Sequence, residues 1–356
     1  MLPFCIFIYN IMNKIITLTA ISLTLLFFAG ALYASERYSV YGGMASEVLV
    51  SPRSAALSAS DLAVNSAGPL ISNPSLAAVT APAALTLSYS SYYGDVFSTS
   101  MLNYTGPVGK DGGFGASAAY LLIPGIEDTR GVDISAIDTD DIKTFTASDV
   151  WTRFSYGHRF ETDIADLHFG AAVTARRRRL ETISAYGLGA DLGAMAHFKK
   201  QSLYAALLWE NVSYSVVRWQ RSNYKERVPQ HLRLSFAFER ENPYFYGRFA
   251  LFYTSPDLLF NEGINHQGQG GGLMEEDRVP QTLSFSDGPA VLFSAGRYGA
   301  EYTIMKTLTL RAGFNNHSYS MGAGLNLFGS RAGVDFGYMS HELSGTVKMS
   351  ITYRWL

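Results

Sequence analysis

Gly345-Thr346-Val347-Lys348-Met349-Ser350-Ile351-Thr352-Tyr353-Arg354-Trp355-Leu356, the last stretch of the chain, alternates strictly between two kinds of side chain. Apolar or aromatic residues occupy the odd positions 347–355, and polar residues occupy the even positions 346–354. Successive side chains of a strand point to opposite faces, so this pattern predicts a strand with one apolar and one polar face. Its length suits a tilted membrane-crossing strand, which needs about 9–11 residues. An edge strand of a soluble antiparallel sheet would show the same alternation.

Composition favours the membrane alternative. The chain has 356 residues, with 22 Tyr, 22 Phe and 33 Gly but only 16% charged residues. A net charge of −2 gives no sign of a nucleic-acid partner. The single cysteine, Cys5, lies before or within the predicted leader, so we expect no disulfide in the mature chain.

The N-terminus resembles a secretory signal peptide covering residues 1–34. A short basic region at Met12–Lys14 precedes an apolar core at Ile15–Ala31, and small residues allow cleavage after Ala34. Either Met1 or Met12 is the true start, and an uncleaved anchor helix is the competing interpretation. No later run approaches the ~20 apolar residues of a spanning helix. A membrane protein with this sequence must therefore be a closed barrel, because only helices and barrels satisfy their backbone in lipid.

The remainder divides into two parts. Residues 35–83 are rich in small residues and lack a period of two, which favours an N-terminal plug folded into the barrel; a periplasmic tail is the alternative. Residues 84–356 predict an all-β, transmembrane antiparallel β-barrel of about 14 strands. These strands are 84–91, 96–105, 113–122, 150–160, 167–176, 185–197, 202–210, 231–239, 244–254, 294–304, 307–314, 318–328, 331–340 and 343–355.

The lengths of the connections support this barrel. The long connections, 123–149, 177–184, 211–230 and 255–293, are all odd-numbered along the chain, and every even-numbered one has about seven residues or fewer. Outer-membrane barrels combine short periplasmic turns with longer outside loops. Nothing in the architecture of a soluble β-sandwich favours long loops at every second connection. The predicted location is therefore the outer membrane, with lipid as the partner of the outer face.

Charged residues at polar strand positions are predicted to face the lumen. On the lipid face at mid-depth, Arg or Lys would cost about 2–4 kcal/mol. Such a polar network either forms a pathway or simply fills the lumen. Its members are Arg153, Asp191, Arg233, Glu301, Arg311, Asp335, Lys348 and Arg354.

Motifs for chemistry are missing from the sequence. The seven histidines are scattered, and the acidic run at Asp138–Asp141 lacks the Gly and terminal Glu of a calcium loop. No nucleophile elbow or phosphate-binding loop is present. We expect no enzyme, no cofactor and no metal site. The basic run Arg176–Arg179 either binds lipopolysaccharide or is a solvated strand end.

Several short stretches match the motifs of one known barrel family, namely Arg53–Leu57, Asn73–Leu76, Asp191–Ala194, Asn211 and Pro229. They resemble the PorV/PorQ family of FadL-like outer-membrane barrels, most closely PorQ. Arg53–Leu57 is similar to the opening motif of that family, with Ser58-Ala59 in place of its Gly pair. Asn73-Pro74-Ser75-Leu76 is similar to its Asn-Pro-Ala-x-Leu motif, with Ser75 in place of Ala. Further matches are Asp191-Leu192-Gly193-Ala194, Asn211 and Pro229. The resemblance implies fourteen strands and an N-terminal plug carrying Arg53, Asn73 and Pro74.

Two functions follow from the resemblance. The preferred one is a component of type IX protein secretion, which attaches cargo to the cell surface together with other secretion-system or surface proteins. The loops 123–149, 211–230 and 255–293 would be its docking surface, because they mix aromatics with charges. The alternative is a FadL-like transporter for a hydrophobic ligand. The sequence does not decide between them.

Overall fold

The computed structural model describes residues 48–64, 72–79, 82–130, 142–212, 215–220, 225–242, 246–259, 290–315, 318–341 and 344–355. All of these belong to one compact unit, Ser39–Leu356. The predicted signal peptide, 1–34, and part of the predicted plug lie outside the described residues. Within the described ranges, none of the helices has the length and apolar character needed to span a membrane.

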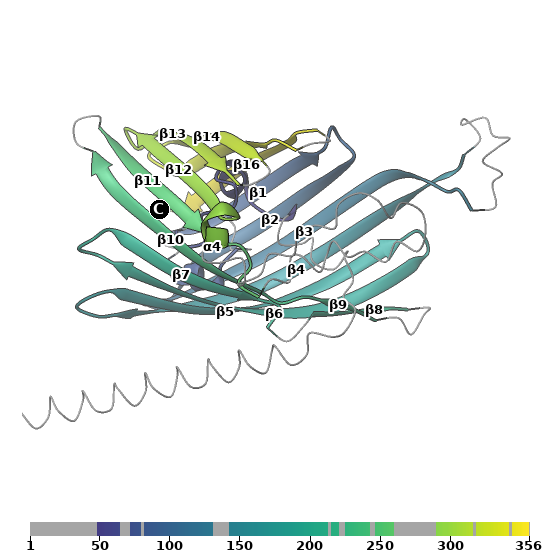
Figure 1. Cartoon of the computed structure of the whole chain (residues 1–356), viewed down its shortest axis with the longest axis horizontal. Helices are drawn as coiled ribbons and strands as arrows, with labels where there is room; N and C mark the ends of the chain where they lie inside the picture. Colours follow the sequence, from purple (N-terminus) through teal and green to yellow (C-terminus); the bar gives the residue numbers. More distant parts are fainter. Residues whose placement is uncertain are drawn as a thin grey trace, which may run out of the picture. The chain divides into compact units, whose positions relative to one another are not determined.

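Fourteen strands close into a ring of antiparallel neighbours (Figure 1). Each strand pairs with the next strand of the ring, β1 pairs with β16, and β5 pairs with β6 to close the circle. The predicted fold class, a 14-stranded barrel, is therefore confirmed. Its strands are β1 (Ala83–Tyr92), β2 (Phe97–Val108), β3 (Gly112–Glu127), β4 (Thr144–Glu161), β5 (Asp166–Leu180), β6 (Ile183–Phe198), β7 (Leu203–Glu210), β10 (His231–Asn242), β11 (Gly247–Thr254), β12 (Arg297–Ile304), β13 (Leu308–Phe314), β14 (Tyr319–Leu327), β15 (Ala332–Met339) and β16 (Thr346–Trp355).

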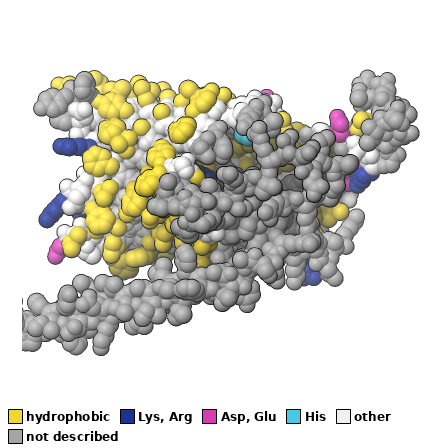
Figure 2. Space-filling view, in the orientation of Figure 1, with side chains coloured by type: hydrophobic (Ala, Val, Ile, Leu, Met, Phe, Trp, Pro, Cys, Tyr) yellow, Lys and Arg dark blue, Asp and Glu magenta, His cyan; other side chains and the backbone are white. Residues whose placement is uncertain are grey.

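Side chains alternate between the inside and the outside of the ring. Along β16, Thr346, Lys348 and Ser350 are buried, while the apolar residues between them are exposed. Leu87 and Ile351, which face each other on β1 and β16, are 59% and 63% exposed. Figure 2 shows hydrophobic side chains spread over the strands, with most visible charged side chains toward the two ends. A barrel with an apolar outside and a polar inside satisfies its backbone and its side chains in a membrane.

The wall has unequal height. Strands β3–β6 contain 15 to 18 residues, whereas β11–β13 contain 7 or 8. The extra residues extend β3–β6 toward the end of the barrel that carries the long connections, which we call the long-loop end; the opposite end is the short-turn end. A short helix, α4 (Ala290–Ser294), precedes β12 at the long-loop end (Figure 1).

The connection 211–230 was predicted as a loop, and this is wrong. It contains the strands β8 (Ser215–Trp219) and β9 (Lys225–Val228), which form a hairpin. Strand β8 pairs with Ala185–Leu188 of β6, beyond the point where β7 ends. The extended β6 would otherwise leave unpaired backbone groups at its edge, and the hairpin covers them.

Candidate functional site: the inside of the barrel and its outer face

An N-terminal segment lies against the inward-facing side chains of the barrel. We call residues 48–64 and 72–79 the inner segment. It contains the helix α3 (Pro52–Ala56) and the 3₁₀ helix η2 (Pro74–Val79). Helix α3 begins where the Ser51 side chain accepts a hydrogen bond from the Ser54 amide at 3.0 Å, with Pro52 at the first helical position. Leu57 ends it, and the next two residues have positive φ angles.

Strands from different parts of the ring bind the inner segment through its backbone carbonyls. Thr254 of β11 donates to the Ser60 carbonyl at 2.9 Å, and Ser320 of β14 donates to the Ala56 carbonyl at 3.0 Å. Lys348 of β16 donates from Nζ to the Val48 carbonyl at 3.1 Å. A buried carbonyl needs such a partner, and here inward side chains supply it.

A row of four inward glycines makes room for η2. Gly113, Gly157, Gly170 and Gly193 pair with one another in sequence across β3–β6. A Cβ atom on Gly170 would lie 2.4 Å from the carbonyl carbon and oxygen of Pro74, and one on Gly193 would lie 2.0 Å from Asn73 Oδ1. Any larger residue in this row would collide with the inner segment. The row therefore fixes where Asn73 and Pro74 lie.

Arg53 stands at the centre of a buried ion cluster. Its Nη1 lies 2.7 Å from Asp61 Oδ2, and its Nε lies 3.0 Å from Glu301 Oε2 on β12. Glu301 also accepts from Arg311 Nε at 2.8 Å, and Arg311 Nη1 reaches Asp335 Oδ1 at 2.6 Å. Burial alone would lower the pKa of Arg53, but the carboxylates of Glu301 and Asp61 raise it above its ordinary value. The guanidinium thus stays charged and ties α3 to three strands.

A second cluster lies across β4, β6, β7 and β10. Arg153 forms an ion pair with Asp191, whose other oxygen accepts from the Asn211 amide at 2.7 Å. On the neighbouring strands, Arg233 forms an ion pair with Glu210. Asn211 has a positive φ angle of 53°, so the Asp191 carboxylate holds the chain at the point where it leaves β7. This cluster anchors the base of the β8–β9 hairpin.

Lys348 is the third inward cation, and its described partners are neutral oxygens. Besides the Val48 carbonyl, Nζ contacts the Tyr92 hydroxyl and lies 3.4 Å from Ser90 Oγ. Its side chain is among the most fully buried of the described residues. The ring of Tyr92 stacks on Phe97 with centroids 4.3 Å apart.

These two rings belong to an inward-facing apolar patch at the long-loop end, which we call the luminal patch. It is built from β1–β4 and from the start of the inner segment. Its buried members are Val48, Leu49, Tyr92, Phe97, Met101, Ala119, Leu121 and Trp151. A second buried apolar cluster lies where the inner segment packs on β6, β7, β10 and β11, and it includes Leu57, Leu76, Met195 and Phe252. The luminal patch differs from it in containing three aromatic rings, those of Tyr92, Phe97 and Trp151.

The eight predicted luminal residues thus form separate groups. Arg311 joins Glu301 to Asp335, and Glu301 also binds Arg53. Arg153 binds Asp191. Arg233 and Lys348 have partners that the prediction did not name. Arg354 lies apart at the short-turn end, where it donates to the Ser330 carbonyl at 3.1 Å. Asp61, Glu210 and Tyr92 were missed because no alternation pattern indicates which charges meet across a lumen.

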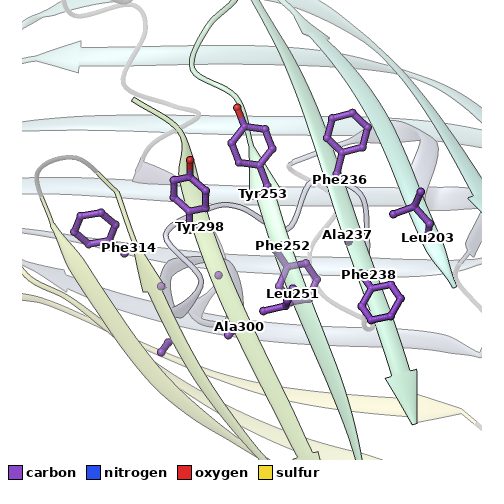
Figure 3. Close-up of a pocket in the computed structure, with 13 residues that line it drawn as sticks. Leu203, Phe236, Ala237, Phe238, Leu251, Phe252, Tyr253, Tyr298, Ala300 and Phe314 are labelled. Carbon is purple, nitrogen blue, oxygen red and sulfur yellow. The ribbon is translucent and has the colours of Figure 1, made fainter. Parts of the chain in front are cut away.

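The outer face carries an apolar groove on β7 and β10–β13 (Figure 3). Its volume is about 570 Å³. Register places Phe314, Tyr298, Tyr253 and Phe236 in one row across four strands, with Ala312, Ala300, Leu251 and Phe238 in the next row toward the short-turn end. Ala300 and Ala312 have small side chains, and this creates the depression between the larger residues around them. Tyr253 and Tyr298 donate to carbonyls of Leu292 and Phe293, both at 2.6 Å, so α4 borders the aromatic row.

Comparison with known proteins identifies the fold. No protein-family model matches the sequence, and no curated protein sequence matches it. Among solved structures, the toluene transporter TodX of Pseudomonas putida matches with a TM-score of 0.51 at 11% identity, covering 89% of this chain and 98% of TodX. A deletion mutant of TodX, a monoaromatic hydrocarbon channel, matches with a TM-score of 0.51 at 10% identity over 85% and 98% of the two chains. A FadL homologue of Pseudomonas aeruginosa gives 0.49 at 11% identity over 86% and 98%.

The closed ring, its apolar outside and its buried inner clusters define an outer-membrane β-barrel protein. Its fold is similar to that of TodX.

Proposed function

We propose that this protein is an outer-membrane channel for small hydrophobic molecules, and that the inner segment is its plug. The luminal patch carries the proposal. Water-filled barrels have polar interiors, because a hydrated solute gains nothing from apolar walls. Here Tyr92, Phe97 and Trp151 present buried rings at the long-loop end, where a molecule from outside would enter. The likeness of the fold to a toluene transporter and a hydrocarbon channel supports the same class of solute.

The inner segment closes the route in this proposal. Val48 and Leu49 pack on the strand residues of the luminal patch, and α3 and η2 are held against opposite parts of the wall. Passage then requires part of the segment to move. Val48 touches the patch directly, so binding of an apolar molecule there competes with it. The ion cluster around Arg53 and the glycine row would keep the rest of the segment in place.

The preference for a type IX secretion component rested on short motifs in Arg53–Leu57 and Asn73–Leu76. Both stretches have structural roles, in the ion cluster and in packing on the glycine row. The structural neighbours favour the alternative, a transporter of hydrophobic molecules. Much of the predicted docking surface lies outside the described residues, including 131–141 and 260–289. A role in secretion is therefore kept as the alternative that the binding experiment below can reveal.

Binding of toluene to purified barrel tests the proposal. Met101 faces the lumen within the luminal patch, whereas Met349 faces outward on β16. Met101→Gln keeps the side-chain length but adds a polar amide to the patch, and Met349→Gln makes the same change on the outside. Trp151 lies in the patch, so its fluorescence reports occupancy in a background where Trp209, Trp219 and Trp355 are replaced by Phe. We expect saturable quenching that weakens several-fold in Met101→Gln and stays unchanged in Met349→Gln.

Two results would count against a channel. One is quenching that never saturates or that responds equally to both substitutions. The other is recovery of secretion partners with the barrel from mild detergent, together with two findings in a strain that lacks this protein. These findings are loss of cargo from the cell surface and hydrocarbon binding equal to that of the parent strain.

A further inference from the structure

The run Arg176–Arg179 at the long-loop end of β5 separates into two pairs. Arg176 and Arg178 face inward and bind Asp149 of β4, at 2.6 Å and 2.9 Å. Arg177 and Arg179 are exposed on the outer face. The inward pair stabilises the tall part of the wall. Arg177 and Arg179 do not contact the barrel interior, so their side chains are available to bind a molecule on the outer face.

Strand register places a further arginine beside this pair. Arg177 pairs with Tyr186 on β6, and Tyr186 pairs with Arg218 on β8. Arg177 lies over the Tyr186 ring, with its guanidinium carbon 5.9 Å from the ring centroid. Neighbouring strands are ~4.8 Å apart, so the two arginine backbones stand about 10 Å apart with the ring between them. Arg218 comes from the hairpin that the sequence did not reveal.

Neither Arg177 nor Arg218 has a carboxylate partner among the residues that the structure describes. Glu181, in the turn after β5, is engaged by Arg130 at 3.0 Å. Arg179 donates to the Glu181 carbonyl, at 3.0 Å, and has no carboxylate partner among the described residues. Exposed guanidinium groups that gather without acids on one face form a site for a doubly or multiply charged anion, and Arg suits phosphate best because its donors match phosphate oxygens in pairs.

The surface directly below is apolar. Val173 on β5 and Leu188 on β6, the next outward residues toward the short-turn end beyond Ala175 and Tyr186, are 56% and 66% exposed. Tyr186 therefore stands where the apolar band ends and the arginines begin, the position of the aromatic belt at a membrane interface. A molecule that fits this face has phosphates on top and acyl chains beneath.

We propose that the outer face of β5, β6 and β8 binds lipopolysaccharide, with its phosphates on Arg177, Arg179 and Arg218 and its acyl chains along Val173 and Leu188. A soluble phosphate would use the arginines but not the apolar surface beneath them. A lipid of the outer leaflet uses both, because the barrel presents the arginines directly above the apolar surface. Basic surfaces next to the membrane boundary bind acidic lipid head groups in this way.

The test compares two double variants in detergent. Arg177→Gln/Arg218→Gln removes two charges from the proposed site. Lys306→Gln/Arg331→Gln removes two charges from exposed turns at the short-turn end and is the matched control. Retention of the heat-resistant folded form on gels shows that each variant is intact. Binding of purified lipopolysaccharide, of the same lipid with its phosphates removed, and of phosphatidylglycerol is measured by native mass spectrometry.

We expect Arg177→Gln/Arg218→Gln to weaken binding of lipopolysaccharide at least tenfold and the control to leave it unchanged. Removal of the lipid phosphates should weaken binding to the wild type by a similar factor. Binding of lipopolysaccharide by Arg177→Gln/Arg218→Gln as tight as by the wild type would overturn the site. An equal loss of binding in both double variants would also overturn it, because such a loss indicates unspecific charge attraction. Phosphatidylglycerol binding with the same affinity and the same dependence on Arg177 would overturn the assignment to lipopolysaccharide.

Discussion

Arg53 of α3 and Glu301 of β12 lie 248 positions apart in the chain, yet they form a buried ion pair with Nε 3.0 Å from Oε2. The pair joins the inner segment to the barrel wall. Glu301 also binds Arg311, and Arg53 also binds Asp61. Each charge therefore has at least two partners, which is how a buried charge is made tolerable.

Arg53→Met should loosen the inner segment without opening the barrel. Breaking a buried pair from one side costs about 3–5 kcal/mol, because the remaining charges lose their partner. We expect the free energy of opening of α3, measured by amide hydrogen exchange over residues 51–64, to fall by that amount. Arg130→Gln, at the exposed pair with Asp128, is the control and should leave this exchange unchanged. Unaltered protection of α3 in Arg53→Met would show that the cluster does not hold the segment.

The glycine row gives a second prediction, for η2. Gly170→Val places atoms where the Pro74 carbonyl lies, whereas Ala171→Val adds a similar volume on the exposed outer face one residue away. Ser75 is fully buried, so a Ser75→Cys reporter should react slowly with maleimide. We expect labelling at least tenfold faster when Gly170→Val is added, and no change with Ala171→Val. Equal labelling in both backgrounds would mean that η2 packs elsewhere.

The depth of the barrel in the membrane can be tested along β16. Ile351→Arg should cost about 2–4 kcal/mol, because it places a charge on the lipid face at mid-strand. Trp355→Arg changes an equally outward residue at the strand end and should cost about 0–1 kcal/mol. Urea titration of folding into phosphatidylcholine vesicles measures both. Similar costs at the two positions would contradict the placement of β16 across the bilayer.

The sequence was informative wherever one strand carries its own signal. All fourteen strands of the ring were predicted, because apolar outward positions and polar inward positions alternate even in strands as short as β13. The ends of β3–β6 were not, since their extension past the apolar band depends on pairing with neighbours. The hairpin β8–β9 was missed for the same reason: β8 has five residues and is held by the edge of β6.

The candidate site was harder to predict than the strands. The alternation of polar and apolar residues along the strands placed Glu301 and Arg311 inside. Their link to Arg53, however, depends on how α3 lies in the lumen. Pairs such as Arg153 with Asp191 join strands that are not neighbours in the ring. The glycine row did leave a signal in the sequence. Gly113, Gly157, Gly170 and Gly193 sit at inward positions of successive strands, and this would have indicated a segment packed against β3–β6.

Uptake of a hydrophobic solute tests the central claim most directly. Cells of a host that lacks its own hydrocarbon channel would express the wild type, Met101→Gln or Met349→Gln, matched for folded barrel in the outer membrane, and uptake of radiolabelled toluene at low concentration would be measured. The proposed channel predicts faster uptake with the wild type and with Met349→Gln, and a several-fold slower rate with Met101→Gln. Uptake no faster than in cells without the protein would contradict it.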